Sequence, residues 1–514
     1  MRAATAAILI AIASALPVGW DEGYTWERLD ALAPWLKGFA DGRTAWSEQF
    51  SAATLDRVWL FAREEPHGHG PAYALLALAG QAATGWLLPP PLSLRAGSVL
   101  LFAFAAGSVF RLLAERWSKG IALVSVLLLV SLPRQIPEVC FSLVDGPLLS
   151  FSLLAFVGFA RVAAGENGLK VLLRWSVPWG LAMSTKLTGW FLLGPYALLA
   201  LIFPSKRLWV RGVIGTLLAL ATVLVVNVGW WPDPARSVWG YFQSNLTRAA
   251  TRPIPTYFMG ETYPFSLPWY NVAVWTFVAM PPATFLLAVC GVVTAVRRVR
   301  IDWLGTLLLL HWACFSVLRS LPQAPGHDGT RQLIIPLAFA ALLGGYFLWR
   351  LTTWMLPRAG IYVGIVGALS AIVSTGLYHP HYLSYYSPLA GGLRKASAYF
   401  EPTYFWDGLT AEARAWLDEN TPPDRTVLFC NYTPSFHYLH RWELLKAKPF
   451  HPKEAPLAPK WFVLQHRTGM MTEAQRRMAA EMTPAFSVRR GNVTLLSIYP
   501  IEDHDRALRE GGGR

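Results

Sequence analysis

Two adjacent carboxylates, Asp21 and Glu22, follow directly after the first apolar segment of the chain. That segment, residues 3–18 with the glycine and tryptophan after it, is long enough to cross a bilayer at about 1.5 Å per residue. Carboxylates are costly in lipid, so we expect the pair to face a wet cavity at the membrane surface, where a carboxylate can accept the proton of an attacking hydroxyl. The alternative is that the pair only begins a solvated loop.

Further charged residues stand at the ends of later apolar segments. Asp145 begins the segment 143–160, Lys186 lies in S-T-K-L-T-G, Arg248 lies in the long loop 230–270, and Arg331 ends G-H-D-G-T-R. Basic side chains bind phosphate, and arginine does so with two parallel hydrogen bonds. Acids on one wall and cations on another suit the transfer of a group from a lipid phosphate to an acceptor, because the cations stabilise the departing phosphate.

Each of these residues also has a structural interpretation that the sequence leaves open. Asp145 could serve only as an acid at a helix N-terminus, and Lys186 could be a snorkelling or topology-marking lysine. Arg331 could be an interface anchor, or could pair with Asp328 three residues earlier.

The sequence leaves metal binding open. His67 and His69 have the H-x-H spacing of metal ligands, but a lone H-x-H among glycines is a weak signal. A divalent metal is therefore a possible cofactor that the sequence does not decide. The four cysteines are scattered and form neither a disulfide framework nor a zinc-ligand spacing.

Composition identifies an integral membrane protein. Of 514 residues 54% are hydrophobic and only 15% are charged, with a mean hydropathy of +0.35. The net charge of +14 comes from short Lys and Arg clusters between apolar segments. Such clusters are typical of topology signals, so we exclude nucleic acid as a partner.

The positive clusters predict one topology of about eleven spans, because they all belong in the cytoplasm. Residues 21–95 then form an outer loop, with interfacial helices at 24–39 and 44–62 and an apolar segment, 71–88, in the outer interface. All the candidate site residues fall on the outer side. The later candidate spans are 96–113, 120–138, 143–160, 174–185, 187–203, 212–229, 271–294, 303–320, 332–350 and 360–378.

Residues 379–514 are more polar and predict a small extracytoplasmic α/β domain after the membrane domain, 1–378. Strands are expected at 427–430, 461–465 and in a hairpin over 486–499, with its turn at 490–492. Helices are expected at 410–419 and 472–481, with Thr410 and Thr472 as N-caps.

Five short motifs, in order along residues 1–380, resemble the membrane glycosyltransferases of the C-type fold. They are D-E at 21–22, H-G-P-A-Y at 69–73, S-L-V-D-G-P-L-L around Asp145, G-L-A-M-S-T-K-L-T-G around Lys186, and R-Q-L-I-I-P from Arg331. The nearest resemblance is to protein O-mannosyltransferases and to the aminoarabinose transferases of lipid A. This chain departs from relatives at two glycines: Gly70 replaces the first proline that usually follows the histidine, and Gly146 separates Asp145 from its proline.

The resemblance implies transfer of a sugar, with inversion, from a polyprenyl-phosphate donor to a hydroxyl of a protein, lipid or glycan acceptor outside the cytoplasm. It implies that Asp21 is the general base with Glu22 beside it, that Asp145 is a second acid near the acceptor or the sugar, and that Lys186 and Arg331 bind phosphate. Arg248, from its place in the outer loop 230–270, is expected to bind the donor phosphate as well. The expected location is the bacterial inner membrane, with the site on the periplasmic side.

Two rival functions remain, a transporter or flippase of a lipid-linked sugar and a non-enzymatic membrane scaffold. The nearly charge-free interiors of the apolar segments favour surface chemistry over transport. A scaffold would not need the acids and cations to converge.

Overall fold

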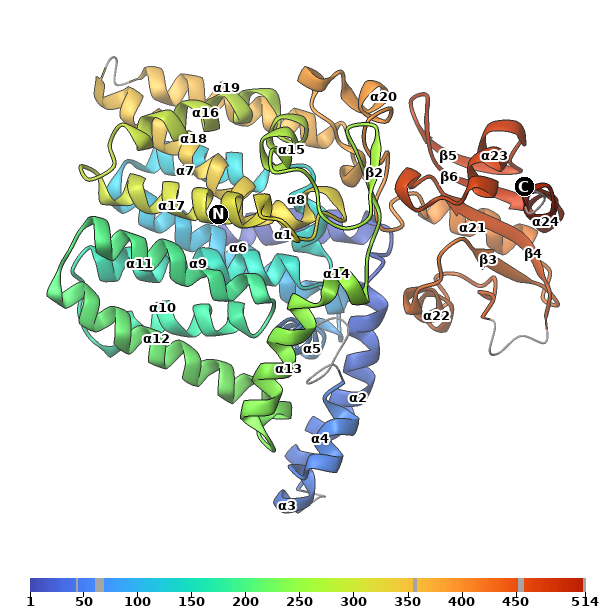
Figure 1. Cartoon of the computed structure of the whole chain (residues 1–514), viewed down its shortest axis with the longest axis horizontal. Helices are drawn as coiled ribbons and strands as arrows, with labels where there is room; N and C mark the ends of the chain where they lie inside the picture. The colour runs from blue at the N-terminus through green and yellow to red at the C-terminus, as the bar shows by residue number, and fades with distance from the viewer. Residues whose placement is uncertain (43–44, 61–68, 355–357, 452–456, 512–514) are drawn as a thin grey trace.

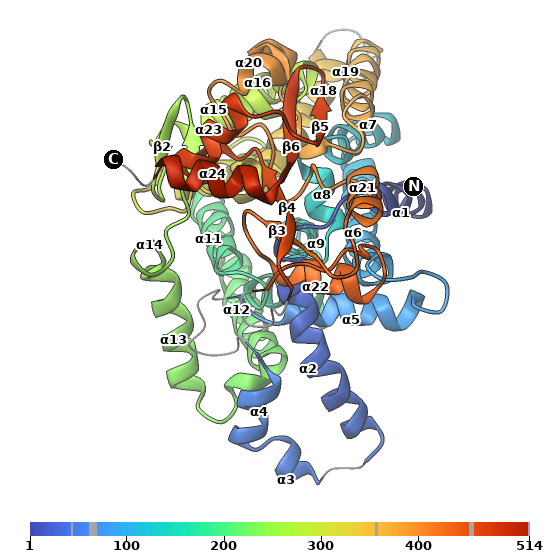
Figure 2. The same cartoon turned by 90° about the vertical axis from the view of Figure 1, so that its right-hand side faces the viewer.

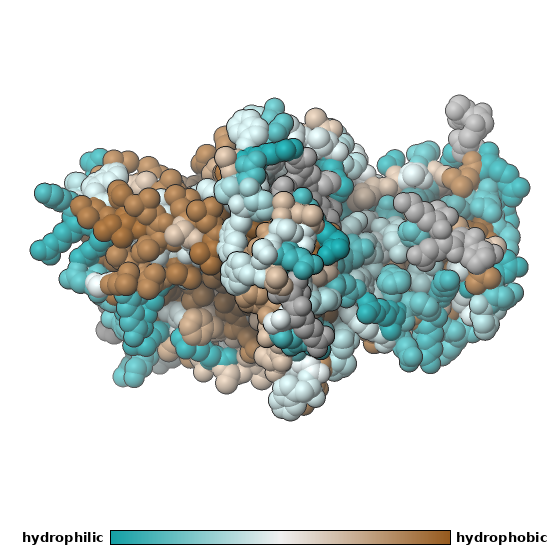
Figure 3. All heavy atoms as spheres, turned by 90° about the horizontal axis from the view of Figure 1, so that it is seen from below, coloured by the Kyte–Doolittle hydropathy of each residue, from teal (hydrophilic) through white to brown (hydrophobic). Residues whose placement is uncertain are grey.

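A computed structural model describes residues 1–42, 45–60, 69–354, 358–451 and 457–511, which form a helical body and a smaller sheet-containing domain (Figure 1). The sheet domain is formed by the C-terminal part of the chain and lies at one end of the body. The helical body carries a broad apolar surface, whereas the sheet domain is mostly polar outside (Figure 3). An apolar surface is expected of a part embedded in the membrane and a polar surface of a part exposed to water, so the helical body is the membrane domain.

The α-helices of the body follow the apolar segments closely. They are α1 (Arg2–Ala15), α2 (Glu22–Ala40), α3 (Trp46–Gln49), α4 (Ala52–Val58), α5 (Ala72–Thr84), α6 (Leu92–Arg116), α7 (Lys119–Val130), α8 (Gln135–Cys140), α9 (Asp145–Ala163), α10 (Leu169–Met183), α11 (Leu193–Ile202), α12 (Lys206–Val226), α13 (Pro234–Leu246), α14 (Arg248–Thr251), α15 (Asn271–Ala279), α16 (Pro282–Val296), α17 (Trp303–Ser320), α18 (Ile334–Trp354) and α19 (Ala359–Gly376). Short 3₁₀ helices, η1 (Leu187–Leu192), η2 (Val228–Trp230) and η3 (Gly329–Leu333), and a small hairpin, β1 (Thr256–Phe258) with β2 (Glu261–Tyr263), join them.

Six helices of the described residues are long and apolar enough to cross a membrane: α6, α9, α12, α17, α18 together with η3, and α19. Five further apolar helices are shorter, α1 and α5 among them. The chain is therefore a multi-pass membrane protein, whereas the predicted count of about eleven spans is not confirmed.

Small residues let the helices of the body approach closely. A Cβ added at Gly158 of α9 would lie 2.5 Å from the backbone of Trp175 on α10, and one at Gly291 of α16 would lie 2.1 Å from the carbonyl of Leu343 on α18. Both distances are far below van der Waals contact, so only glycine permits these crossings.

The helix predicted at 24–39 is present as α2, and the helix predicted at 44–62 is present in part, as the short α3 and α4. They extend away from the rest of the body in both views (Figures 1 and 2). Trp35 packs edge-on against Phe50 and Trp59, which closes this segment on itself. An aromatic cluster at this place suits the membrane interface, as expected from the sequence.

The C-terminal domain contains a four-stranded sheet in the order β3-β4-β6-β5. Its strands are β3 (Thr426–Phe429), β4 (Pro459–Gln465), β5 (Phe486–Arg490) and β6 (Val493–Pro500), and its longer helices are α21 (Ala411–Asn420), α22 (Pro434–Arg441), α23 (Glu473–Glu481) and α24 (Ile501–Gly511). The β3–β4 pair is parallel and the other two pairs are antiparallel. The predicted strands and hairpin are confirmed, as are the N-caps Thr410 and Thr472, the latter in a full capping box with Gln475.

The segment after α19 packs with the helical body before the sheet domain begins. Tyr382, Tyr386 and Phe405 belong to the core of the body. Trp406 and Leu409 belong to a second core shared by the sheet domain and α2. This segment includes η4 (Tyr382–Ser384), η5 (Pro388–Ala390) and α20 (Gly392–Ala396). The sheet domain therefore rests on the body through a shared apolar core.

Candidate active site

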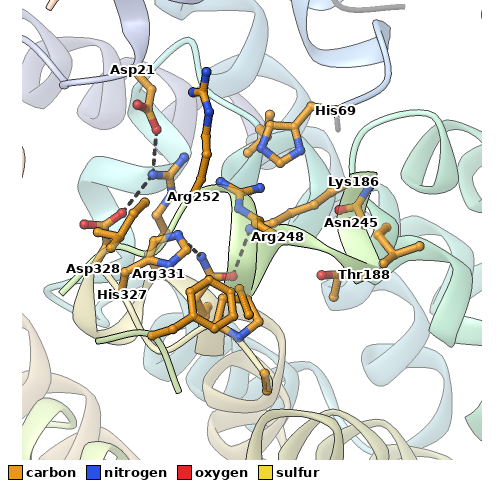
Figure 4. Close-up of a pocket in the computed structure, with 18 of the residues that line it drawn as sticks. Asp21, His69, Lys186, Thr188, Asn245, Arg248, Arg252, His327, Asp328 and Arg331 are labelled. Atoms are coloured by element: carbon orange, nitrogen blue, oxygen red, sulfur yellow. Dashed lines mark hydrogen bonds and ion pairs between the residues drawn. The ribbon is translucent and has the colours of Figure 1, made fainter. Parts of the chain in front are cut away.

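A cavity of about 690 Å³ lies where the body meets the C-terminal domain (Figure 4). Its walls come from segments that are far apart in sequence: the turn between α1 and α2, the loop after α10, the helices α13, α14 and α17, the segment before η3, and the C-terminal domain. The charged side chains on its wall are Asp21, Lys186, Arg248, Arg252, Arg319, Asp328, Arg331 and Arg467. Cations therefore outnumber carboxylates, which suits an anionic ligand.

Arg331 is the central cation of this wall. Its Nη1 donates to Asp21 Oδ2 at 2.7 Å and to Asp328 Oδ2 at 3.1 Å, and its Nε donates to Asp145 Oδ2 at 2.5 Å. The pairing of Arg331 with Asp328 is the i,i+3 pair that the sequence suggested. Three carboxylates fix one guanidinium, so its orientation towards the cavity is set before any ligand arrives.

Lys186 follows α10 and shares Asp145 with Arg331. Its Nζ donates to Asp145 Oδ1 at 2.8 Å and to Gln332 Oε1 at 3.1 Å. Burial lowers the pKa of Lys186 to about 8, against the opposing effect of Asp145. The ammonium group is therefore the cation of this site whose charge is most sensitive to mildly alkaline pH.

The three aspartates of the Arg331 network differ in exposure. The Asp328 side chain is only 8% exposed and is held by both Arg331 and Arg467. The Asp21 side chain is 34% exposed and lines the cavity, whereas the Asp145 side chain is 1% exposed and lies behind Lys186 and Arg331. Asp21 is the carboxylate that can meet a ligand. Asp145 accepts hydrogen bonds from Lys186 and Arg331 and holds these two cations in position.

Glu22 is placed differently from its neighbour Asp21. It is fully buried, it does not line the cavity, and its carboxylate pairs with Arg95 at 2.6 and 2.9 Å. It also accepts from the backbone of Ser142 and from the backbone of Gly19. Arg95 in turn donates to the carbonyls of Ala13, Leu16 and Pro17 at the end of α1. Glu22 therefore joins α1, α2 and α6 and does not face the cavity.

The structure also brings in residues that the sequence did not single out. Arg319 of α17 lines the cavity and donates to Thr188 Oγ1 at 2.8 Å. Arg467, which follows β4, lines it as well and donates to Asp328 Oδ1 at 2.7 Å. Burial by itself would raise the pKa of Asp328, but Arg467, His327 and Arg331 hold that pKa below its usual range. No local motif marks Arg467, because its role depends on a contact across 139 residues.

The described residues contain no group of three or more His, Cys, Asp and Glu side chains that could hold a metal ion. His69 lines the cavity, whereas His67 lies outside the described residues. The H-x-H pair is therefore not described as a whole, and the structure does not test the metal site that the sequence left open at His67 and His69.

The fold and part of the sequence match known proteins. Residues 90–231, less than a third of the chain, match the family of dolichyl-phosphate-mannose-protein mannosyltransferases. No curated protein matches the sequence. The structure is similar to the crystal structure of ArnT from Cupriavidus metallidurans bound to undecaprenyl phosphate, with a TM-score of 0.51 and 15% sequence identity. The match covers 97% of each chain. The apo structure of the same protein has a TM-score of 0.53 at 13% identity, again over 97% of each chain.

Nearly the whole length of this chain thus has the fold of a C-type membrane glycosyltransferase, with a small sheet domain at its C-terminus. The resemblance that the sequence motifs suggested is confirmed at the level of the fold. Fold alone does not define an activity, which depends on the side chains of the site.

Proposed function

We propose that this protein transfers a sugar from a polyprenyl-phosphate donor to an acceptor hydroxyl on the extracytoplasmic side of a membrane. The observation that carries the proposal is the pairing of Asp21 with Arg331 on the wall of a cavity that also holds Lys186 and Arg248. One wall therefore offers both a carboxylate and a cluster of cations. The similarity to ArnT bound to undecaprenyl phosphate supports the donor class.

The donor phosphate binds to Lys186, Arg331 and Arg248 in this proposal. Arg248 begins α14, and burial together with the nearby charge of Arg331 lowers its pKa. Crowded cations repel one another, and a phosphate dianion or diester relieves that repulsion. The polyprenyl chain then leaves the cavity along the apolar surface of the helical body.

The reaction is a displacement at the anomeric carbon of the sugar. The acceptor oxygen forms a bond to that carbon while the bond from the carbon to the phosphate oxygen breaks. The acceptor proton passes to the Asp21 carboxylate, and the phosphate departs with the polyprenyl chain. The cations stabilise the charge that develops on the phosphate, and attack opposite to the leaving group inverts the anomeric carbon.

Asp145 and Glu22 act as positioning residues in this scheme, because neither lines the cavity. Asp145 holds Lys186 and Arg331 together, and Glu22 holds the turn that carries Asp21. The expected side of the membrane is the periplasmic side of a bacterial inner membrane, which the positive clusters between the apolar segments support.

Asp21→Asn tests the proposal, because the amide keeps the size of the side chain but cannot accept the proton. Mass spectrometry first identifies the glycan that is lost when the gene is deleted. The wild-type gene restores that glycan, and we expect Asp21→Asn not to restore it although the protein inserts in the membrane at the normal level. Restoration at the wild-type level would contradict the proposal. Movement of a lipid-linked sugar across the membrane without transfer would favour a transporter instead.

A further inference from the structure

Asp21 is the N-cap residue of α2, yet its side chain does not cap the helix. An aspartate at this position normally accepts a hydrogen bond from the backbone N–H two or three residues on. Here the carboxylate points towards the cavity and binds Arg331 instead (Figure 4). Something else must therefore satisfy the first N–H groups of α2.

The missing cap comes from the C-terminal domain. The N–H of Gly23, the second residue of α2, donates to Oγ of Ser435 at 2.8 Å across 412 residues of sequence. Ser435 is fully buried and belongs to α22. Gly23 permits the approach, since a Cβ there would lie 2.1 Å from the Ser435 backbone nitrogen.

The same part of α22 also holds the residues before Asp21. Ser435 Oγ lies 3.0 Å from both the Gly19 and the Trp20 carbonyl oxygens, and Thr433 Oγ1 donates to the Trp20 carbonyl at 2.5 Å. The Trp20 ring stacks on Trp406 with a centroid distance of 6.1 Å and an interplanar angle of 9°. The backbone is thus fixed on both sides of Asp21 by the C-terminal domain.

We infer that Ser435 is a positioning residue for the reaction: it caps α2 from the C-terminal domain and thereby keeps the Asp21 carboxylate available to the cavity. Without this hydroxyl, the free N–H of Gly23 attracts the carboxylate of its own N-cap residue. Asp21 then turns back onto α2 and away from Arg331 and the acceptor. The inference rests on the proposed function, in which Asp21 is the base.

The variants Ser435→Ala, Ser435→Cys and Ser435→Thr separate the hydrogen bond from packing. Alanine removes the acceptor, cysteine keeps nearly the same size but accepts hydrogen bonds weakly, and threonine keeps the hydroxyl. We expect transfer to fall about ten- to hundredfold in the alanine and cysteine variants, because small displacements of a catalytic group cost that much. Most of the transfer should be retained in the threonine variant.

Tyr438→Phe is the matched control. It removes the 2.7 Å hydrogen bond from Tyr438 to Asp30, which also joins α22 to α2 but lies away from the Asp21 turn. Loss of a contact between the same two helices should leave transfer at the wild-type level if only the cap matters. Trp26 still packs between Tyr438 and Trp442, which keeps the two helices together.

The experiment measures restored glycan per amount of membrane-inserted protein, together with the affinity of each purified full-length variant for undecaprenyl phosphate. The inference predicts transfer reduced about ten- to hundredfold, with unchanged affinity, in Ser435→Ala and Ser435→Cys. It is overturned if Ser435→Ala transfers like wild type, if Ser435→Cys does so, or if Tyr438→Phe is equally impaired. Should Ser435→Thr fail to accumulate, the cysteine variant alone decides between the hydrogen bond and packing. Failure of the proposed function itself would appear separately, as transfer that survives Asp21→Asn.

Discussion

At the scale of single residues, the proposed reaction needs one accessible carboxylate to accept the proton and several cations to bind the phosphate. Asp21 is the carboxylate partly exposed to the cavity, and Asp145 lies behind the cations it holds. Buried carboxylates that pair with cations are structural in many proteins, so exposure decides which aspartate can take a proton. The sequence predicted both residues but not this difference, because exposure depends on the packing of distant segments.

The buried Lys186 makes the proposed reaction sensitive to pH. With a pKa of about 8, its ammonium group loses its proton as the pH rises from roughly 7 to 9, and phosphate binding weakens in that range. We expect kcat/KM for the lipid-linked donor to fall on the alkaline side with this pKa. In Lys186→Arg the guanidinium stays charged, so this fall should disappear. An unchanged alkaline limb in Lys186→Arg would show that another group causes it.

At the scale of elements, the end of α1 and the start of α2 are tied to α6 by Glu22 and Arg95. Glu22→Ala would leave the Arg95 guanidinium buried without its carboxylate, at a cost of about 3–5 kcal/mol. We expect a clear loss of thermal stability in detergent and less protein in the membrane. Asp21→Asn should show neither loss.

A Glu22→Ala protein that has wild-type thermal stability but transfers no sugar would contradict this structural role. It would indicate that Glu22 takes part in the reaction. The matched reference is Glu473, whose pairs with Arg476 and Arg477 are exposed and whose removal should change stability little.

The elements of the C-terminal domain were largely predictable, because their signals are local. The hairpin turn carries Gly491 at a φ of +56°, and Thr472 and Gln475 form a capping box within one helical turn. α22 was missed, although Thr433 as N-cap with a proline at the next position is a recognised start signal. The number of spans could not be predicted, because a single apolar segment can form two shorter helices. The predicted span 271–294, for example, forms α15 and α16.

At the scale of the whole molecule, the C-terminal domain completes the site. Arg467 reaches the cavity from this domain and binds Asp328, which in turn binds Arg331. No pattern in the sequence joins these residues, so only the folded chain reveals the connection. The C-terminal domain therefore contributes directly to the wall of the cavity.

Arg467→Gln tests this contribution. Without Arg467, both oxygens of the Asp328 carboxylate are left to Arg331, which then shifts from its place on the cavity wall. We expect transfer to fall about tenfold as a result. Arg441→Gln is the matched control, since the Arg441 pair with Asp30 also joins the two parts of the molecule but is 55% and 53% exposed. Exposed pairs contribute little, so this variant should behave like wild type. Equal loss in both variants would indicate weakened docking of the domain rather than a role in the site.

The most direct measurement compares wild type and Asp21→Asn in two assays on the same purified, full-length protein. One assay follows transfer of the sugar from the lipid-linked donor, and the other follows binding of undecaprenyl phosphate. Because the cations remain in place, we expect Asp21→Asn to bind undecaprenyl phosphate normally and to transfer no sugar. Transfer at the wild-type rate by Asp21→Asn would contradict the account.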